Sequence, residues 1–171
     1  RLNTDSQRLE FFAQDRWYEM ATDTPTLEGG ARGFILGGYP GYTDRIERIQ
    51  IATAGNGVDF GNLAYSTSLK GNVSDRTRLC TYGDYNAPDS TMVNSIEFIT
   101  MATEGDTVDF GDMSEGRYSP QPVSNSTRGV YMGGTNVYNS ISGTINNIEF
   151  ITIQSTGNSV DFGDMTTKTS T

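Results

Sequence analysis

Residues 145–165 read INNIEFITIQSTGNSVDFGDM, and two earlier segments are versions of the same stretch. They are VNSIEFITMATEGDTVDFGDM at 93–113 and DRIERIQIATAGNGVDFGNL at 44–63. In each version an isoleucine lies 14 residues before the phenylalanine of the VDFG box; the pairs are Ile46 and Phe60, Ile96 and Phe110, and Ile148 and Phe162. Recurrence at a fixed spacing indicates tandem structural units, and we expect three copies of one unit of roughly fifty residues.

Each copy has the pattern of a β-hairpin. The segments IERIQIAT, IEFITMAT and IEFITIQS alternate apolar and polar residues, which predicts a strand with one buried face. AGNG, EGDT and TGNS supply the turn, and VDFG begins the returning strand. Upstream, ARGFILGG, TRLCTYGD and TRGVYMGG are short apolar runs with glycine near the end, typical of a strand that enters a turn. One more strand fits between each VDFG box and the next such run, so we predict three four-stranded antiparallel repeats in an all-β protein.

The chain also divides along its length. Residues 1–21 predict a small N-terminal β-meander that serves as an attachment module, and residues 22–30 have linker composition. Residues 31–171 hold the repeats, with boundaries at 31–75, 76–125 and 126–171. Trp17 has few local partners in the meander, so we expect it to pack on a neighbouring chain or on the first repeat. Because the sequence begins without Met, we expect it to be a piece of something longer.

One connection in the repeat varies in length. The interval from Gly38 to Ile46 is eight residues, that from Asp84 to Ile96 is twelve, and that from Gly134 to Ile148 is fourteen. Variation confined to equivalent loops places them on one face of a repeat protein, which is often the binding face. These loops combine Tyr with Ser, Asn and Gly, a mixture suited to recognition, although they are equally explained as polar turns. The candidate ligand-binding residues are Tyr39, Tyr42, Tyr85, Asn86, Asn136, Tyr138 and Asn139.

Composition excludes several classes of function. The net charge is -9, which argues against binding to nucleic acid, because such binding depends on Lys and Arg. The chain has no histidine, so Ser-His-Asp, Cys-His and His-ligated metal sites are excluded. The single cysteine, Cys80, cannot form an internal disulfide and is best explained as a small buried apolar residue. No apolar run is long enough to span a bilayer, and we predict no cofactor, no metal and no membrane insertion.

Acidic residues recur in every repeat. Asp59, Asp109 and Asp161 of the VDFG boxes could bind calcium or serve acid–base chemistry. Their recurrence favours a structural role in turns, because a catalytic pair is normally unique, so we predict no catalytic residue and no enzyme. Glu47, Glu97 and Glu149 are expected at outward strand positions. Arg32, Arg78 and Arg128 are expected to pair with these acids between repeats.

The combination STRGVYMGG followed by NNIEFITIQSTGNSVDFGDM resembles repeats of tail, fibre and other structural proteins of tailed bacteriophages, especially marine and cyanobacterial ones, over residues 30–165. The order of strands also resembles a Kelch-like propeller blade, with Phe where Kelch blades carry Trp. Residues 1–21 resemble a second phage-associated module. The resemblance implies a virion protein that contacts other virion proteins, copies of itself or host surface glycans.

Three hypotheses follow for function, and three for architecture. The first function is a non-catalytic virion structural or attachment protein on a tail, fibre or capsid surface; the alternatives are a stand-alone lectin and a carboxylate-only polysaccharide-degrading enzyme. Propellers have four to eight blades, so three repeats leave the ring open. We expect further blades beyond Thr171, or a propeller completed by other copies of the chain, or a triangular β-prism.

Overall fold

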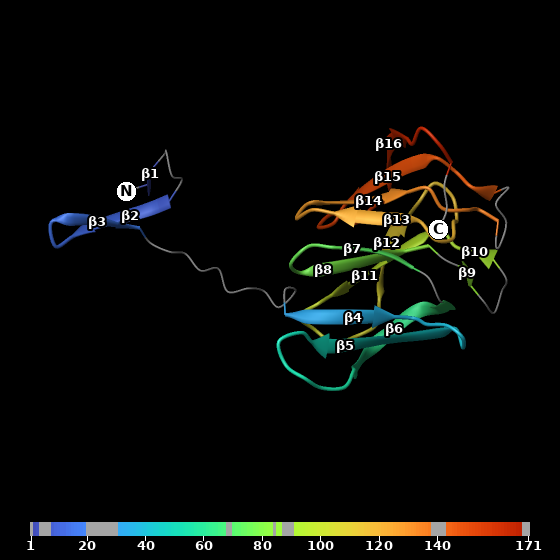
Figure 1. The fold of residues 1–171 in the computed structure, drawn as a ribbon, viewed down its shortest axis with the longest axis horizontal. Coiled ribbons are helices and arrows are strands. Elements are labelled where there is room, and N and C mark those ends of the chain that lie inside the picture. The colour runs from blue at the N-terminus through green and yellow to red at the C-terminus, as the bar shows by residue number, and fades with distance from the viewer. Residues whose placement is uncertain are drawn as a thin grey trace.

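The computed structural model describes residues 2–3, 8–19, 31–67, 70–83, 85–86, 91–137 and 143–168. The named elements in these ranges are all β-strands, and they pair in antiparallel sheets (Figure 1). The prediction of an all-β chain is therefore confirmed.

The N-terminal strands form a three-stranded sheet of their own. Strand β1 (Leu2–Asn3) pairs with β2 (Arg8–Ala13), which pairs with β3 (Arg16–Glu19). Gln14 and Asp15 both have positive φ, the conformation of a two-residue hairpin turn. Trp17 packs against Phe12 of the facing strand, with ring centroids 5.3 Å apart. Antiparallel pairing places the two rings opposite each other, so Trp17 has a local partner in Phe12, and its packing on a neighbouring chain or on the first repeat stays a prediction.

Three larger sheets follow. The first contains β4 (Arg32–Leu36), β5 (Thr43–Gln50) and β6 (Val58–Thr67) in the order β4-β5-β6. The second contains β7 (Gly71–Ser74), β8 (Arg78–Tyr82), β11 (Ser95–Thr100) and β12 (Val108–Asp112) in the order β12-β11-β8-β7. The third contains β13 (Gln121–Ser124), β14 (Arg128–Met132), β15 (Asn147–Thr152) and β16 (Val160–Asp164) in chain order. Strands β9 (Tyr85–Asn86) and β10 (Thr91–Met92) form a short separate ribbon.

The prediction of four strands is confirmed for the second and third sheets, whereas the first sheet has three strands among the residues that the structure describes. The leading strands β7 and β13 are each built from residues that follow a VDFG box, and no such box precedes β4. The last strand of each of the first two sequence repeats consequently belongs to the sheet of the next repeat. Val73 of β7, which the boundary at 75 and 76 groups with the first repeat, pairs with Cys80 in the second sheet.

The three sheets stack side by side (Figure 1), with apolar side chains filling the two spaces between them. The first space holds Ile46, Phe60 and Leu63 together with Leu79, Ile99 and Met101 of the second sheet. The second space joins the other face of the second sheet to the third and holds Val73, Cys80, Tyr82, Ile96, Phe110, Met113, Tyr131, Ile151 and Ile153. Neighbouring residues of a strand point to opposite faces, so the middle sheet is buried on both sides. The described sheets do not close into a ring.

Candidate loop-end binding site

The structure brings three of the candidate tyrosines together. The rings of Tyr39 and Tyr42 meet edge to face with centroids 6.0 Å apart. The rings of Tyr42 and Tyr85 lie 6.4 Å apart. We call Tyr39, Tyr42 and Tyr85 the tyrosine cluster. Two of the variable loops, separated in the sequence by strands β5, β6, β7 and β8, therefore meet at one end of the sheets (Figure 1).

Tyr42 is the central member of the cluster and has an unusual backbone. Its φ is 40°, in the left-handed region that bulky residues rarely adopt. Such a conformation persists only where the surroundings hold it, and it is often found at binding sites. Tyr39 is 78% exposed, whereas Tyr42 and Tyr85 are half-buried. The cluster thus exposes the ring of Tyr39, which packs on the half-buried ring of Tyr42.

The remaining candidates are divided. Asn86 follows Tyr85 in β9 and is half-buried. Asn136 lies in the third variable loop, where its side-chain amide donates to Glu115 Oε2 at 3.0 Å and its backbone N–H donates to the Gly143 carbonyl at 3.1 Å. Tyr138 and Asn139 lie outside the described residues.

Two buried ion pairs were not anticipated from the sequence. Lys70 Nζ lies 3.2 Å from Glu97 Oε1, and Arg117 Nη2 lies 2.7 Å from Glu149 Oε2. All four side chains are almost completely buried. The outward position predicted for Glu97 and Glu149 is wrong, because each lies on a sheet face that the preceding sheet covers. Only Glu47, on the uncovered face of the first sheet, is partly exposed, and it lies 3.4 Å from Arg45.

The sequence spacing of these pairs hid them. Lys70 precedes Glu97 by 27 residues, whereas Arg117 precedes Glu149 by 32. The basic partners therefore do not align as a repeated position, although each follows a VDFG box. That shared location is the one signal in the sequence that could have identified them.

The recurring arginines also act differently from the prediction. Arg32 Nη1 donates to the Met101 carbonyl at 2.6 Å, and Arg78 Nη1 donates to the Ile153 carbonyl at 3.3 Å. The contacts of Arg32 and Arg78 across the junctions are thus with backbone carbonyls of the next sheet, where pairing with acidic residues was expected. The prediction that they connect neighbouring repeats is confirmed for these two.

In the second and third sheets, the turn that precedes the VDFG strand also bonds to the preceding sheet. Gly105 N–H donates to the Phe60 carbonyl at 2.9 Å, and Gly157 N–H donates to the Phe110 carbonyl at 2.7 Å. Thr107 and Ser159 make the matching bonds two residues later, to the carbonyls of Asn62 and Asp112. Strands β6 and β12 are thus each bonded along the outer edge by the turn of the next sheet.

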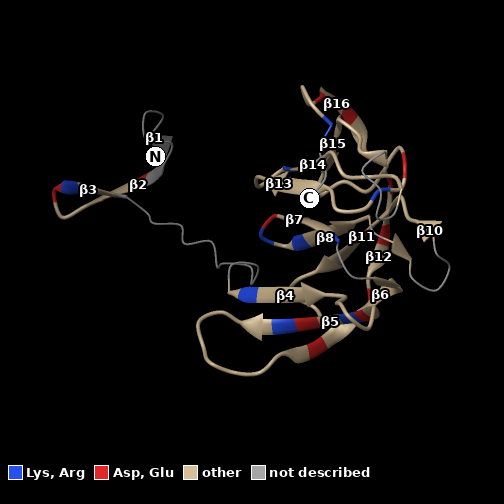
Figure 2. Cartoon of the chain, turned by 45° about the vertical axis from the view of Figure 1, so that its right-hand side comes forward, with Lys and Arg blue, Asp and Glu red and all other residues tan. Residues whose placement is uncertain are grey.

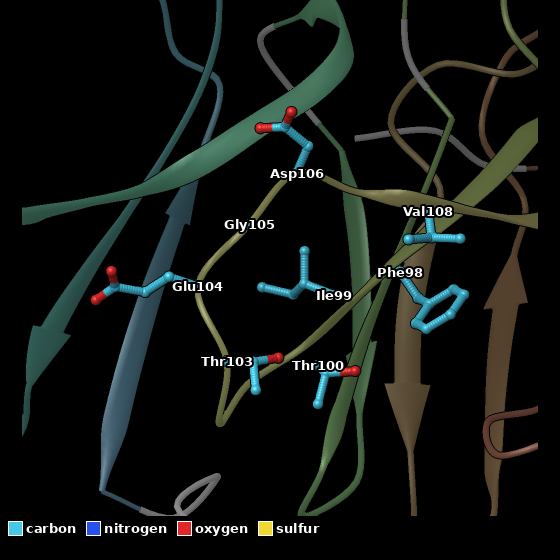
Figure 3. Close-up of a pocket in the computed structure, with 8 residues that line it drawn as sticks. All are labelled: Phe98, Ile99, Thr100, Thr103, Glu104, Gly105, Asp106 and Val108. Atoms are coloured by element: carbon cyan, nitrogen blue, oxygen red, sulfur yellow. The ribbon is translucent and has the colours of Figure 1, made fainter.

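A hollow of about 220 Å³ lies beside the turn of the second sheet (Figure 3). Its acidic residues already have partners: Glu104 pairs with Arg48 at 2.9 Å, and Asp106 Oδ1 accepts the backbone N–H of Asn62 at 2.9 Å. Figure 3 shows Glu104 on one side of the strand, opposite Phe98 and Val108. The hollow is a part of the junction between sheets, and both of its carboxylates bond across that junction.

The single cysteine, Cys80, is buried in the interior. Burial raises the pKa of the Cys80 thiol to about 12, so the thiolate is scarce at neutral pH. Within the described ranges, His, Cys, Asp and Glu side chains do not gather in groups of three that could hold a metal ion. Acidic and basic segments are interspersed along the sheets in Figure 2. In the same part of the chain, no helix is long and apolar enough to cross a membrane.

No protein-family model matches the chain, and no curated protein matches it.

Proposed function

We propose that this chain is a non-catalytic structural and attachment protein of a bacteriophage particle, located on a tail, fibre or capsid surface. In this proposal its three sheets are Kelch-like blades, and its partners are other virion proteins, copies of itself and glycans on the host surface. The likeness of the repeats to phage tail and fibre repeats supports the setting. The tyrosine cluster is the single observation that supports binding.

The chemistry of the cluster suits a carbohydrate. Tyr39 offers an exposed aromatic face with a hydroxyl at its edge, and the T-shaped contact with Tyr42 holds that face in position. A rigid ring loses little conformational freedom when it binds, which makes tyrosine a common anchor in recognition loops. The surface is also acidic overall, and this favours a neutral or basic ligand over an anionic polymer.

A binding assay on an array of bacterial surface glycans tests the proposal. We expect Tyr39→Ala to weaken binding of the best glycan by about tenfold, which corresponds to about 1.4 kcal/mol. Tyr18→Ala is the matched control, because Tyr18 lies in the N-terminal hairpin, stacked on Phe11. Equal affinity of the Tyr39→Ala and unmodified chains would remove the cluster as the binding site.

The virion location needs its own experiment. Antibodies against the chain, applied to purified particles with gold labelling, are expected to mark one part of the tail or capsid surface. Absence of the chain from the mass spectrum of purified particles would end the proposal of a virion protein, whatever the result of the glycan assay.

A further inference from the structure

The two internal junctions between sheets repeat one set of contacts, which gives a template for a third. In both, a glycine turn donates to the carbonyl of a VDFG phenylalanine, and the arginine of one sheet donates to a carbonyl of the next. A glutamate of the later sheet also accepts a backbone N–H of the earlier one: Ala64 donates to Glu97 at 3.1 Å, and Ser114 donates to Glu149 at 3.2 Å.

The two end sheets of the stack each have an uncovered face with residues equivalent to those that form the internal junctions. We call the surface of the first sheet with Ile35, Ile49 and Ile51 the front face, and the surface of the third sheet with Val123, Val130 and Phe162 the back face. Ile51 is 64% exposed, whereas its equivalents Met101 and Ile153 are at most 3% exposed. Phe162 is 56% exposed, whereas Phe60 and Phe110 are each 3% exposed.

The back face has the shape needed to receive a sheet. A hollow of about 340 Å³ lies on it, lined by Val123, Ser124, Asn125, Arg128, Val130 and Phe162. Gly163 also leaves room beside β16. A side chain at Gly61 or Gly111 would collide with the carbonyl of Gly105 or Gly157, but nothing lies within 4 Å of the same position at Gly163. In the described part of the chain, no turn bonds to the outer edge of β16, where β6 and β12 are each bonded by the turn of the next sheet.

The front face is suited to a four-stranded sheet such as the third. Where the third sheet packs on β7, it presents Gly129, and a Cβ there would lie 2.4 Å from Val73 Cγ2. Where the second sheet packs on the three-stranded first sheet, the same position is Leu79. The first sheet has Gly33 at this position. Gly33 therefore gives the first sheet the room to pack on a sheet that has a leading strand. Strand β13, which contains Val123, is the leading strand of the third sheet.

The two ends of the stack also carry residues of opposite charge at equivalent positions. Glu47 on the front face is equivalent to Glu97 and Glu149. Their basic partners, Lys70 and Arg117, lie in the connections that follow the VDFG strands of the preceding sheets. Lys168 follows the third VDFG box and is exposed. A front face placed against a back face would bring Glu47 toward Lys168, as the internal junctions bring their pairs together.

We propose that the front face of one copy of this chain packs on the back face of a second copy, head to tail, with the contacts of the internal junctions. The turn at 54–57 then bonds to β16, and Arg128 donates to the Ile51 carbonyl of the second copy. Head-to-tail contacts form a ring if the rotation closes. Since propellers have four to eight blades, two copies of three sheets are the arrangement that closes one. This inference is independent of the proposed binding of glycans.

The test blocks each face separately. Ile51→Asp places a charge on the front face, and Phe162→Asp places one on the back face; both positions are exposed in the single chain. Mass in solution is measured by light scattering after size exclusion, for each chain alone and for an equimolar mixture. Val108→Asp is the control, because Val108 is 57% exposed although both faces of its sheet are covered.

We expect the unmodified and Val108→Asp chains to have twice the 18.7 kDa mass of one copy. Each blocked variant alone should have the mass of one copy, because it retains only one usable face. Their mixture should again give the doubled mass, through the one intact front and back pair. A single-copy mass for the unmodified chain, doubled masses for the blocked variants alone, or a mixture that stays at one copy would each overturn the proposal.

Discussion

Asp75 organises the tight turn between β7 and β8. Its Oδ1 accepts the backbone N–H groups of Thr77 and Arg78 at 2.7 and 2.8 Å, and its Oδ2 accepts the side-chain amide of Gln154 from the third sheet. Asn125 makes the same two backbone bonds in the turn before β14. The turn therefore needs an acceptor oxygen at this position, and the charge is an addition specific to the second sheet.

The pKa of Asp75 makes this charge testable. Burial alone would raise the pKa, but the hydrogen bonds from Arg78, Gln154 and Thr77 outweigh it and hold the pKa below its usual value of 3.8. The unfolded chain then binds more protons than the folded one near that pH, so this contribution to stability is complete above it and is lost as the pH falls through the folded pKa.

We expect Asp75→Asn to reduce the loss of stability between pH 5 and pH 3 while it costs about 1 kcal/mol or less at pH 7. Asn125 shows that the amide can hold the turn. Urea unfolding at several pH values measures the change. The same steepness of the pH profile in both chains would contradict the assignment of this charge.

The buried pair of Arg117 and Glu149 is the second residue-scale feature. Breaking such a pair leaves one charge buried alone, so we expect Glu149→Ala to reduce the free energy of unfolding by about 3–5 kcal/mol. Glu47→Ala is the matched control at the equivalent, partly exposed position, with an expected loss below about 1 kcal/mol. Both are made in the Phe162→Asp chain, so that association does not contribute. Similar losses at the two positions would show that burial does not distinguish them.

At the scale of elements, the junction between a VDFG strand and the next turn depends on a glycine. Gly111 has a φ of 144°, and a Cβ there would lie 2.4 Å from the Gly157 carbonyl oxygen. Gly163 has a similar φ of 132° but faces open space. The two positions therefore share the conformational requirement and differ in the contact.

We expect Gly111→Ala to destabilise the chain by about 1–3 kcal/mol more than Gly163→Ala, because the added methyl group forces the turn and strand apart. The comparison is made by chemical denaturation in the Ile51→Asp chain, which keeps the third sheet uncovered. If the two substitutions lower the free energy of unfolding equally, backbone conformation alone explains the losses. The close contact between the strand and the turn would then not contribute to stability.

At the scale of the whole molecule, the sheets differ in how much of each is covered. The second sheet has neighbours on both faces, whereas the first and third each have one uncovered face. Stability in stacked repeats is approximately a sum of terms for the units and for their interfaces. The middle sheet should therefore be the last to open.

Hydrogen exchange measures this difference. In the Ile51→Asp chain, we expect backbone amides of β8 and β11 to exchange more slowly than those of β5 and β15, because opening the middle sheet breaks two interfaces. In the unmodified chain at high concentration, the end sheets should gain protection if the front and back faces meet. Uniform protection across all sheets of the single copy would instead indicate one cooperative unit.

The sequence alone determined the strands and the repeat, because both are local. Strict alternation and the constant interval from Ile46 to Phe60 placed β5 and β6, and the same pattern placed their equivalents. It also placed Tyr39, Tyr42 and Tyr85 in the variable loops. That their rings meet depends on how two sheets lie relative to each other, which no local pattern encodes.

Only the tertiary structure decided which faces are covered. Glu97 alternates as the sequence predicts, yet its side of the strand faces the first sheet and not solvent, so it pairs with Lys70 in the interior. Glu47 has the same local pattern and remains partly exposed. Burial is a property of what lies opposite a residue. Equivalent segments of the repeats therefore acquire different environments according to their place in the stack.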